Sequence, residues 1–452
     1  MGITRQLAQF VVNQSFSDIP NAVKGQAKYT IIDTLGCCIA GYTEAREECE
    51  WVVNLIKDLG GKPESSVFMS GFKTSPPFAA LANGTMIHSI DFDDTHMGSI
   101  SHFSASLVPT VFSLGERLRA DGPGLLEAFV VGFEVGARVG RQMMPSHYRF
   151  WDPTSTFGSL ASVAAASKLL KLDEVQTEYA MGLAADQAAG LRYCIDKGDY
   201  SKSLHPGFAA MQGVMLALLV EKGANGPKGI LEYPTGFCYA FSEEPNIEKI
   251  AQGLGESYEL TSNSLKVYPT ILISHAAIQA VLELMEEHDV GDREILRIRL
   301  RIPRTAKGQG QNYHPETPLA ARLSIPFCVA LAAADKKISL TQFTKERLGD
   351  PHINDLMGRI EIEEDTSLNK QYPETLASVV EMEIKGNGTL RNQVIYPKGN
   401  MKNPMTEDDI TDKFRKLCSV SITRERCEGI LERLLHLDTS DPVQELFDSL
   451  RG

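Results

Sequence analysis

The densest group of side chains able to do chemistry lies between residues 88 and 102 of this 452-residue sequence. It holds three imidazoles and three carboxylates: His88, Asp91, Asp93, Asp94, His96 and His102. Apolar segments flank the group, and charged groups in such surroundings cost free energy unless they are paired or used. The group therefore predicts a functional site. We expect His88 and His96 to be structural, and leave Asp93 and Asp94 open between helix caps, ion-pair partners and functional groups.

Two chemistries that this group suggests are disfavoured by its surroundings. Asp and His are common metal ligands, but the sequence has no dedicated spacing such as H-E-x-x-H. Residues 91–95 (DFDDT) also have the D-x-D-x-T form of haloacid-dehalogenase-type phosphatases, with Asp350 and Asp355 as candidates for the distal acidic motif. Those enzymes need the first aspartate at the end of a strand, whereas residues 78–90 (FAALANGTMIHSI) have a helical pattern. We expect neither a metal site nor phosphoryl transfer.

A third interpretation comes from several strings together. Residues 88–95 (HSIDFDDT), followed by His102, resemble the signature of the MmgE/PrpD family, which includes 2-methylcitrate dehydratase, cis-aconitate decarboxylase and iminodisuccinate epimerase. Four later strings are similar to further family segments: residues 201–207 (SKSLHPG), 265–275 (LKVYPTILISH), 318–328 (PLAARLSIPFC) and 403–414 (NPMTEDDITDKF). The resemblance runs from the first helix to about Leu417. It implies a homodimer of two-domain subunits, with the active site between a helical body and a smaller lid.

The resemblance also implies roles for individual residues. We assign catalytic roles to Asp91, His102, Lys202 and Lys266, and substrate binding to Thr95, Asp152, His205, Tyr268 and His275. The two lysines are point cations that can hold carboxylates and stabilise enolate-like charge. His102 can take or return a proton near neutral pH, with Asp91 fixing its tautomer or raising its basicity. We expect no metal and no cofactor.

Two positions depart from the family pattern. Asp152 precedes Pro153-Thr154 where many members have a histidine, and Ile271 stands where the decarboxylase branch resembles K-x-F-P-x-H. An acidic group at residue 152 would repel a substrate carboxylate unless it is protonated or paired. The loss of two imidazoles weakens the decarboxylase interpretation in particular.

The expected function is that of a lyase that removes a proton next to a carboxylate on a small di- or tricarboxylic acid. The leading expectation is a 2-methylcitrate dehydratase-like dehydration. Three alternatives stay open: epimerisation of an amino- or imino-dicarboxylic acid, decarboxylation of the cis-aconitate type, and a binding protein that kept the fold but lost the chemistry.

The elements expected to position these residues change in character along the chain. Up to about Leu260, apolar residues recur at three- and four-residue spacing, which predicts helices over residues 3–13, 22–40, 47–59, 77–90, 124–139, 157–171, 173–188 and 208–222. Strict alternation then predicts strands over residues 296–302, 359–363, 378–385 and 390–395. Helical pattern returns at Thr406. The sequence predicts a mainly α fold: a large all-helical body (1–264 and 396–452) with a smaller α+β lid domain inserted (265–395).

Composition and charge exclude several other classes. The formal net charge of −13 argues against nucleic-acid binding, which needs a basic face. The eight cysteines include no C-x-x-C pair and are expected to be reduced. The first residues lack the apolar stretch of a signal peptide, and apolar runs such as 214–220 (VMLALLV) are too short to cross a membrane. We expect a cytoplasmic enzyme with a small-molecule carboxylic acid as its substrate and no membrane partner.

Overall fold

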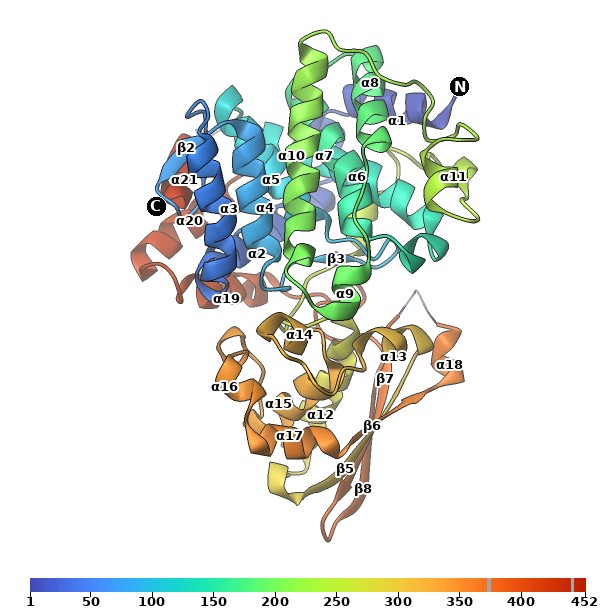
Figure 1. Cartoon of the computed structure of the whole chain (residues 1–452), viewed down its shortest axis with the longest axis vertical. Coiled ribbons are helices and arrows are strands. Elements are labelled where there is room, and N and C mark those ends of the chain that lie inside the picture. The colour runs from blue at the N-terminus through green and yellow to red at the C-terminus, as the bar shows by residue number, and fades with distance from the viewer. Residues whose placement is uncertain (372–374, 440–442) are drawn as a thin grey trace.

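A large helical body and a smaller α+β lid make up the chain (Figure 1), which confirms the expected fold class. The computed structural model describes residues 1–371, 375–439 and 443–452; residues 372–374 of the expected lid and 440–442 of the expected body lie outside the described residues. The body contains α1 (Ile3–Asn13), α2 (Asn21–Glu44), α3 (Arg46–Leu59), α4 (Pro76–His88), α5 (Phe103–Leu118), α6 (Gly122–Met143), α7 (Pro153–Leu169), α8 (Glu174–Asp186), α9 (Tyr193–Lys197), α10 (Ser201–Glu221), α11 (Phe237–Phe241), α19 (Glu407–Cys418), α20 (Arg424–Leu435) and α21 (Gln444–Arg451).

The eight helices expected in the first half are present. The list missed α5, which follows directly after the polar group and carries Pro109 in its interior. Proline removes one helical hydrogen bond and usually ends a helical pattern. Here the fully buried surroundings of α5 outweigh that local cost, so burial rather than propensity decides the helix.

Close packing of α4 on α10 sets the distance between two groups of the site. A Cβ added at Gly84 in α4 would lie 2.7 Å from the Cα of Gly207 in α10, so only glycine permits this approach. Because α4 ends at His88 and α10 begins one residue before Lys202, the contact brings these two side chains together.

The lid is built on a four-stranded sheet in the order β6 (Ile360–Glu364), β5 (Ile295–Ile302), β7 (Ser378–Ile384) and β8 (Gly388–Val394). The β5–β6 pair is parallel and the other two pairs are antiparallel. The lid also contains α12 (His275–Glu287), α13 (Arg304–Gly310), α14 (Pro318–Arg322), α15 (Ile325–Asp335), α16 (Lys345–Leu348), α17 (Pro351–Gly358) and α18 (Thr366–Asn369). All four expected strands are confirmed. The alternation of β5 buries Ile298, Leu300 and Ile302 on one face, as a half-buried strand requires.

Body and lid have separate hydrophobic cores. The body core takes residues from Leu7 to Leu265 and again from Ile410 to Leu450, whereas the lid core lies between Ile273 and Val394. The last helices return to the body, where α19 packs against α2. On this basis we propose that the boundaries between body and lid lie near residues 264 and 396.

The body contains two short strand pairs, and one of them ties distant segments together near the polar group. β1 (Ser65–Val67) pairs with β2 (Phe72–Thr74), and β3 (Thr95–His96) pairs with β4 (Asn263–Ser264). The second pair brings the segment after Asp94 next to the one that leads into Lys266. None of these strands was expected, since two or three residues carry no alternation to detect.

One helix of the described chain, α10, is long and apolar enough to cross a membrane by those two measures alone. More than half of its most apolar window is buried. It packs against α4 and α7 within the body.

Candidate active site

A pocket at the junction of body and lid collects most of the expected site residues. It encloses about 670 Å³ of empty space, part of it open to solvent. Six of the nine predicted site residues line it: Asp91, Thr95, His102, Asp152, Lys202 and Lys266. His205, Tyr268 and His275 do not line it. Residues 271–273, Thr305 and Gln309 close the lid side.

The carboxylate of Asp91 joins the two lysines. Its Oδ1 lies 2.8 Å from Lys202 Nζ and 3.1 Å from Lys266 Nζ. Burial alone would raise the pKa of Asp91, but the two ammonium groups outweigh it and hold that pKa well below its usual range. Burial likewise opposes the charge on Lys202, yet Asp91 raises the pKa of Lys202 above its usual value. Two cations therefore share the Asp91 carboxylate, and the carboxylates of Asp93 and Asp152 also act on Lys202.

The loop that carries Asp91 is held by buried cations from the C-terminal half. Three successive carbonyls, those of Ile90, Asp91 and Phe92, accept hydrogen bonds from Arg322, Lys266 and Lys413 at 3.1, 2.8 and 2.9 Å. Asp91 itself has a φ of 51°, a left-handed conformation that aspartate tolerates better than most residues. The three cations hold this loop in place, so the direction of the Asp91 carboxylate does not depend on the backbone conformation that the loop would prefer by itself.

Lys413 joins the loop that carries Asp91 to the segment that carries Lys266. Its Nζ lies 2.6 Å from Asp33 Oδ1 and donates to the carbonyl of Lys266 at 2.8 Å as well as to that of Phe92. Sequence reasoning missed Lys413, because a lysine in a charged helical segment such as residues 412–416 (DKFRK) is typical of a solvated surface. The geometry gives Arg322 a positioning contact.

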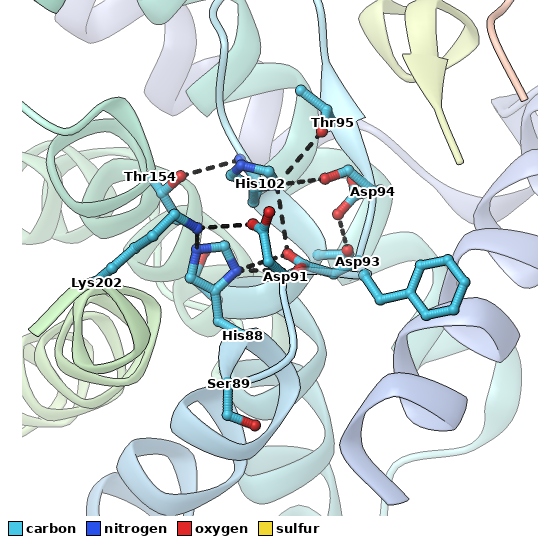
Figure 2. Close-up of polar contacts among 12 residues, drawn as sticks. His88, Ser89, Asp91, Asp93, Asp94, Thr95, His102, Thr154 and Lys202 are labelled. Carbon is cyan, nitrogen blue, oxygen red and sulfur yellow. Dashed lines mark hydrogen bonds and ion pairs between the residues drawn. The ribbon is translucent and has the colours of Figure 1, made fainter. Parts of the chain in front are cut away.

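His88 lies inside the polar network, contrary to its expected structural role. Its Nε2 accepts a hydrogen bond from Lys202 Nζ at 2.7 Å, and its Nδ1 lies 3.0 Å from both carboxylate oxygens of Asp93 (Figure 2). Because an ammonium group can only donate, Nδ1 carries the proton that His88 donates to Asp93. His88 thus connects Lys202 to Asp93, and it also lines the pocket.

His102 is held as a neutral base. Its Nδ1 lies 2.6 Å from the backbone oxygen of Asp94, which can only accept, so Nδ1 carries the proton and Nε2 keeps its lone pair. Burial, although countered by Asp93, lowers the pKa of His102 to about 3. Its nearest carboxylate oxygen is that of Asp93 at 3.5 Å, and its backbone N–H donates to Thr154 (Figure 2). The tautomer is therefore set by the Asp94 carbonyl and Asp93, and not by Asp91 as we expected.

Asp94 and Thr95 frame His102 from the other side. The Ser104 hydroxyl donates to the Asp94 carboxylate, and burial together with Asp93 raises the pKa of Asp94 to about 7. Thr95 Oγ1 lies 3.4 Å from His102 Nδ1. Of the two aspartates left open, Asp93 belongs to the polar network, while Asp94 contributes its backbone carbonyl.

Asp152, which stands where many family members have a histidine, is paired with a cation. Its Oδ2 accepts a hydrogen bond from His205 Nδ1, and its Oδ1 caps α7 by accepting from the Thr154 N–H. Burial disfavours the charged ring, but the bond to Asp152 outweighs it and raises the pKa of His205 to about 10. The same pair holds the pKa of Asp152 below its usual range despite burial. Asp152 therefore faces the pocket as half of an ion pair.

This pair predicts a specific pH dependence of stability. Asp152→Asn should lower the free energy of unfolding near pH 6 by roughly 3–5 kcal/mol, as expected when one partner of a buried pair is removed. The folded-state pKa of His205, about 10, lies above the ordinary value of 6.5. Its stabilisation is thus complete below about pH 6.5 and is lost as pH rises toward 10. Urea unfolding of the wild type and of Asp152→Asn at pH 6, 8 and 9.5 should show that their difference in unfolding free energy becomes smaller as the pH rises.

The exposed pair of Arg149 and Glu243 offers a matched control. Glu243→Gln should change the unfolding free energy little at any of the three pH values, because exposed pairs contribute little. A stability difference for Asp152→Asn that stays constant from pH 6 to 9.5 would contradict a charged His205.

Comparison with known proteins shows the family of the chain. The sequence matches the MmgE/PrpD N-terminal domain over residues 5–250 and the MmgE/PrpD C-terminal domain over residues 268–437. The chain belongs to the MmgE/PrpD family. The C-terminal match extends beyond the lid into α19 and α20, the helices that return to the body.

Relatives in this family align along nearly the whole chain. A cis-aconitate decarboxylase-like protein of Aspergillus oryzae is 28% identical, with 100% of this chain and 97% of the relative covered. The cis-aconitate decarboxylase of Homo sapiens is 26% identical, with 100% and 95% covered. The mitochondrial 2-methylcitrate dehydratase of Yarrowia lipolytica is 26% identical, with 92% and 83% covered.

Two residues that the family resemblance suggested for substrate binding lie behind the pocket wall of this MmgE/PrpD protein. His275 begins α12 and is buried, and burial together with Lys266 lowers its pKa to about 3. Its ring packs against that of Tyr268, with centroids 5.2 Å apart. Tyr268 faces a separate surface groove between lid and body that also includes Lys413. In this structure, contact of either residue with a ligand in the main pocket is therefore indirect.

Two sets of potential metal ligands occur among the described residues: His88, Asp91 and His102, and Asp152, Cys194 and His205. Ligand atoms within each set lie within 4.8 Å of one another. Most members of the two sets already form the ion pairs and hydrogen bonds described above: His88, Asp91, Asp152 and His205. The geometry of these contacts suits proton transfer. The absence of a metal requirement stays a prediction.

The phosphatase alternative is wrong for this fold. The DFDDT segment follows the helix α4 rather than a strand of a Rossmann-like sheet. Asp350 caps α17 and Asp355 pairs with Arg359 on the same lid surface. Neither residue lines the pocket.

Proposed function

We propose that this protein is a metal-independent lyase that dehydrates a 2-methylcitrate-like hydroxy acid by removing a proton next to a carboxylate. The observation that carries the proposal is the unprotonated Nε2 of His102 in the same pocket as two lysines that share the single carboxylate of Asp91. The names of relatives in the family, dehydratases and decarboxylases of tricarboxylic acids, support the same class of reaction.

The chemistry follows from the charges. A substrate carboxylate binds Lys202 and Lys266, whose combined charge exceeds that of Asp91. His102 Nε2 takes the proton from the adjacent carbon, and the lysines stabilise the negative charge that develops on the carboxylate. The electron pair of the broken C–H bond forms a C=C bond to the neighbouring carbon. The hydroxyl group of that carbon leaves as water with a proton from Lys202.

The polar network links the two groups that exchange protons with the substrate. The chain of contacts from His102 to Asp93, His88 and Lys202 has steps of 3.5, 3.0 and 2.7 Å. After the product leaves, His102 returns the proton on Nε2 to solvent and Lys202 takes one from solvent, so the site returns to its starting state. A bound carboxylate offsets the lysine charges that help to lower the pKa of His102, and so raises its basicity.

Decarboxylation is the second candidate, because relatives named for it align along the entire chain. Ile271 lines the pocket and Asp152 is occupied by His205, so neither supplies an imidazole or an acidic proton to a departing group. Epimerisation would use His102 and Lys202 as acid and base on opposite faces of one carbon. Both alternatives share the first proton transfer, and the products distinguish them. A cytoplasmic homodimer stays a prediction.

Proton exchange in deuterated water tests the shared step. Purified protein with 2-methylcitrate, citrate, cis-aconitate and an amino-dicarboxylic acid, followed by NMR, should incorporate deuterium next to a carboxylate in at least one acid. We expect the 2-alkyl hydroxy acid to exchange and to lose water, with full activity after dialysis against a chelator. Binding without exchange in every acid would support a binding protein instead. Activity lost with the chelator and restored by a metal would contradict the metal-independent mechanism.

A further inference from the structure

A cysteine, a histidine and an aspartate meet at the edge of the pocket, and none of them moves a proton in the mechanism above. The ligand atoms of Asp152, Cys194 and His205 all lie within 4.8 Å of one another. Cys194 Sγ is 3.9 Å from His205 Nδ1, which donates to Asp152 Oδ2. Of the two sets of potential metal ligands among the described residues, this set alone contains sulfur. Its ligand chemistry therefore differs from that of the other set.

The fold brings these three side chains together from separate elements. Asp152 caps α7, Cys194 lies in α9, and His205 lies near the start of α10. The Asp152 N–H donates to the carbonyl of Gly190 at 3.0 Å, which holds the segment before α7 beside the segment before α9. Because α10 packs against α7, the imidazole is held at the same place. The arrangement is thus part of the packed structure of the body.

Burial and charge at this place suit a cation better than those around Asp91 do. Asp152 and Cys194 are buried, with 3% and 2% of their surface exposed. Two ammonium groups already lie on Asp91 and oppose a further cation there. The ion partner of Asp152 is His205, and the described lysines and arginines all lie beyond ion-pair distance of it. Unlike an ammonium group, an imidazolium that loses its proton becomes a neutral metal ligand.

A divalent ion can replace two protons here without changing the total charge. One is the proton that His205 donates to Asp152, and the other is the thiol proton that Cys194 donates to the carbonyl of Leu191. The thiolate and the carboxylate then balance the two charges of the ion. Ligands of tetrahedral Zn²⁺ stand roughly 3.5 Å apart, so Nδ1 and Oδ2 need to separate by only about 1 Å.

We propose that Asp152, Cys194 and His205 form a binding site for a thiophilic divalent cation of the Zn²⁺ class, with a fourth coordination position open toward the pocket. Thiolate, imidazole and carboxylate are the protein ligands of Zn²⁺, and three of them with one open position are a common set. Asp152 lines the pocket, so water reaches the ion there. The base and the two lysines are not among the ligands. The inference therefore goes beyond the proposed function, which needs no metal.

Titration with Co²⁺ tests the site, because Co²⁺ bound to a thiolate has a characteristic spectrum. The full-length protein is first dialysed against a chelator and then freed of it. We expect one Co²⁺ per chain, a thiolate-to-Co²⁺ charge-transfer absorption in the near ultraviolet, and displacement by Zn²⁺, since thiolate ligands select Zn²⁺. Zn²⁺ should also raise the thermal unfolding midpoint, because it binds the folded chain.

Single substitutions assign the ligands. Cys194→Ser should abolish the charge-transfer absorption and weaken Zn²⁺ binding by more than about 100-fold, the upper end of what the loss of an outer-shell partner costs. His205→Gln should weaken Zn²⁺ binding to a similar degree. Cys49→Ser is the matched control, because Cys49 is also buried and donates to a backbone carbonyl, that of Gly41, but belongs to neither ligand set. It should bind both ions as the wild type does.

Three results would overturn the proposed metal site. Co²⁺ that binds without the charge-transfer absorption lies at ligands other than sulfur. Absorption that persists in Cys194→Ser places the ion at another thiol. Failure to bind Co²⁺ at a large excess removes the site altogether. Each result leaves the proton-transfer function untouched, because deuterium exchange by the chelator-treated protein tests that function separately.

Discussion

His102→Gln is expected to lower kcat by about 100- to 10,000-fold, the usual contribution of a positioned general base. Glutamine keeps the approximate length of the side chain and can still donate to the Asp94 carbonyl, but it cannot take a proton at the position of Nε2. Substrate affinity should change much less, since the carboxylate is held by Lys202 and Lys266. Steady-state kinetics and deuterium incorporation, measured on the same preparations, check this result.

His436→Gln is the matched control, because His436 is exposed at the end of α20. Its kinetics should equal those of the wild type. A His102→Gln protein that folds normally and still incorporates deuterium at the wild-type rate would remove His102 from the proton-abstraction step, and the base would have to be sought elsewhere in the network.

Lys202→Met and Lys266→Met should each lower kcat/KM by about 100-fold or more, because each removes a cation from the place where negative charge develops. Methionine retains the aliphatic length of lysine, so the packing change is small. The two variants should differ in one respect. In the proposed mechanism Lys202 also gives the proton to the departing hydroxyl group, whereas Lys266 donates to the Asp91 carbonyl, so only Lys202→Met should remove that proton donor.

Three measurements separate these effects. Lys266→Met should raise KM and lower kcat together, while Lys202→Met should in addition slow the dehydration step relative to deuterium exchange. The double variant should lose less than the product of the single losses, because both lysines act on the same charge. Lys222→Met, at an exposed surface lysine, should behave as wild type. Unchanged kinetics in both single variants would refute the electrostatic assignment.

The local pattern of apolar and polar side chains was enough to predict the fold class. Alternation in residues 296–302 predicts β5 because a pleated strand turns successive side chains to opposite faces, and that rule needs no knowledge of the partner strand. Helical spacing served equally well in the body. It failed at α5, where the interior Pro109 is tolerated only because the helix is buried on all sides. Propensity is a local property, whereas burial is not.

Only part of the site could be predicted from the sequence. The polar group at residues 88–102 and the lysines at 202 and 266 could be found from their types, their apolar flanks and the resemblance of the surrounding strings. Their partners could not. The pairing of Asp152 with His205 joins residues 53 apart, and the contact of Lys413 with Phe92 joins residues 321 apart.

The sequence by itself determined which groups able to carry charge are present, and that charged groups amid apolar segments must be paired. Only the tertiary structure decided the pairs: Asp91 with two lysines, Asp93 with His88, and the Asp94 carbonyl with His102. The reason is physical. Coulomb energy and hydrogen bonding depend on distances of a few ångströms between atoms, and those distances are set by how α4, α10, β3 and the lid pack, not by spacing along the chain.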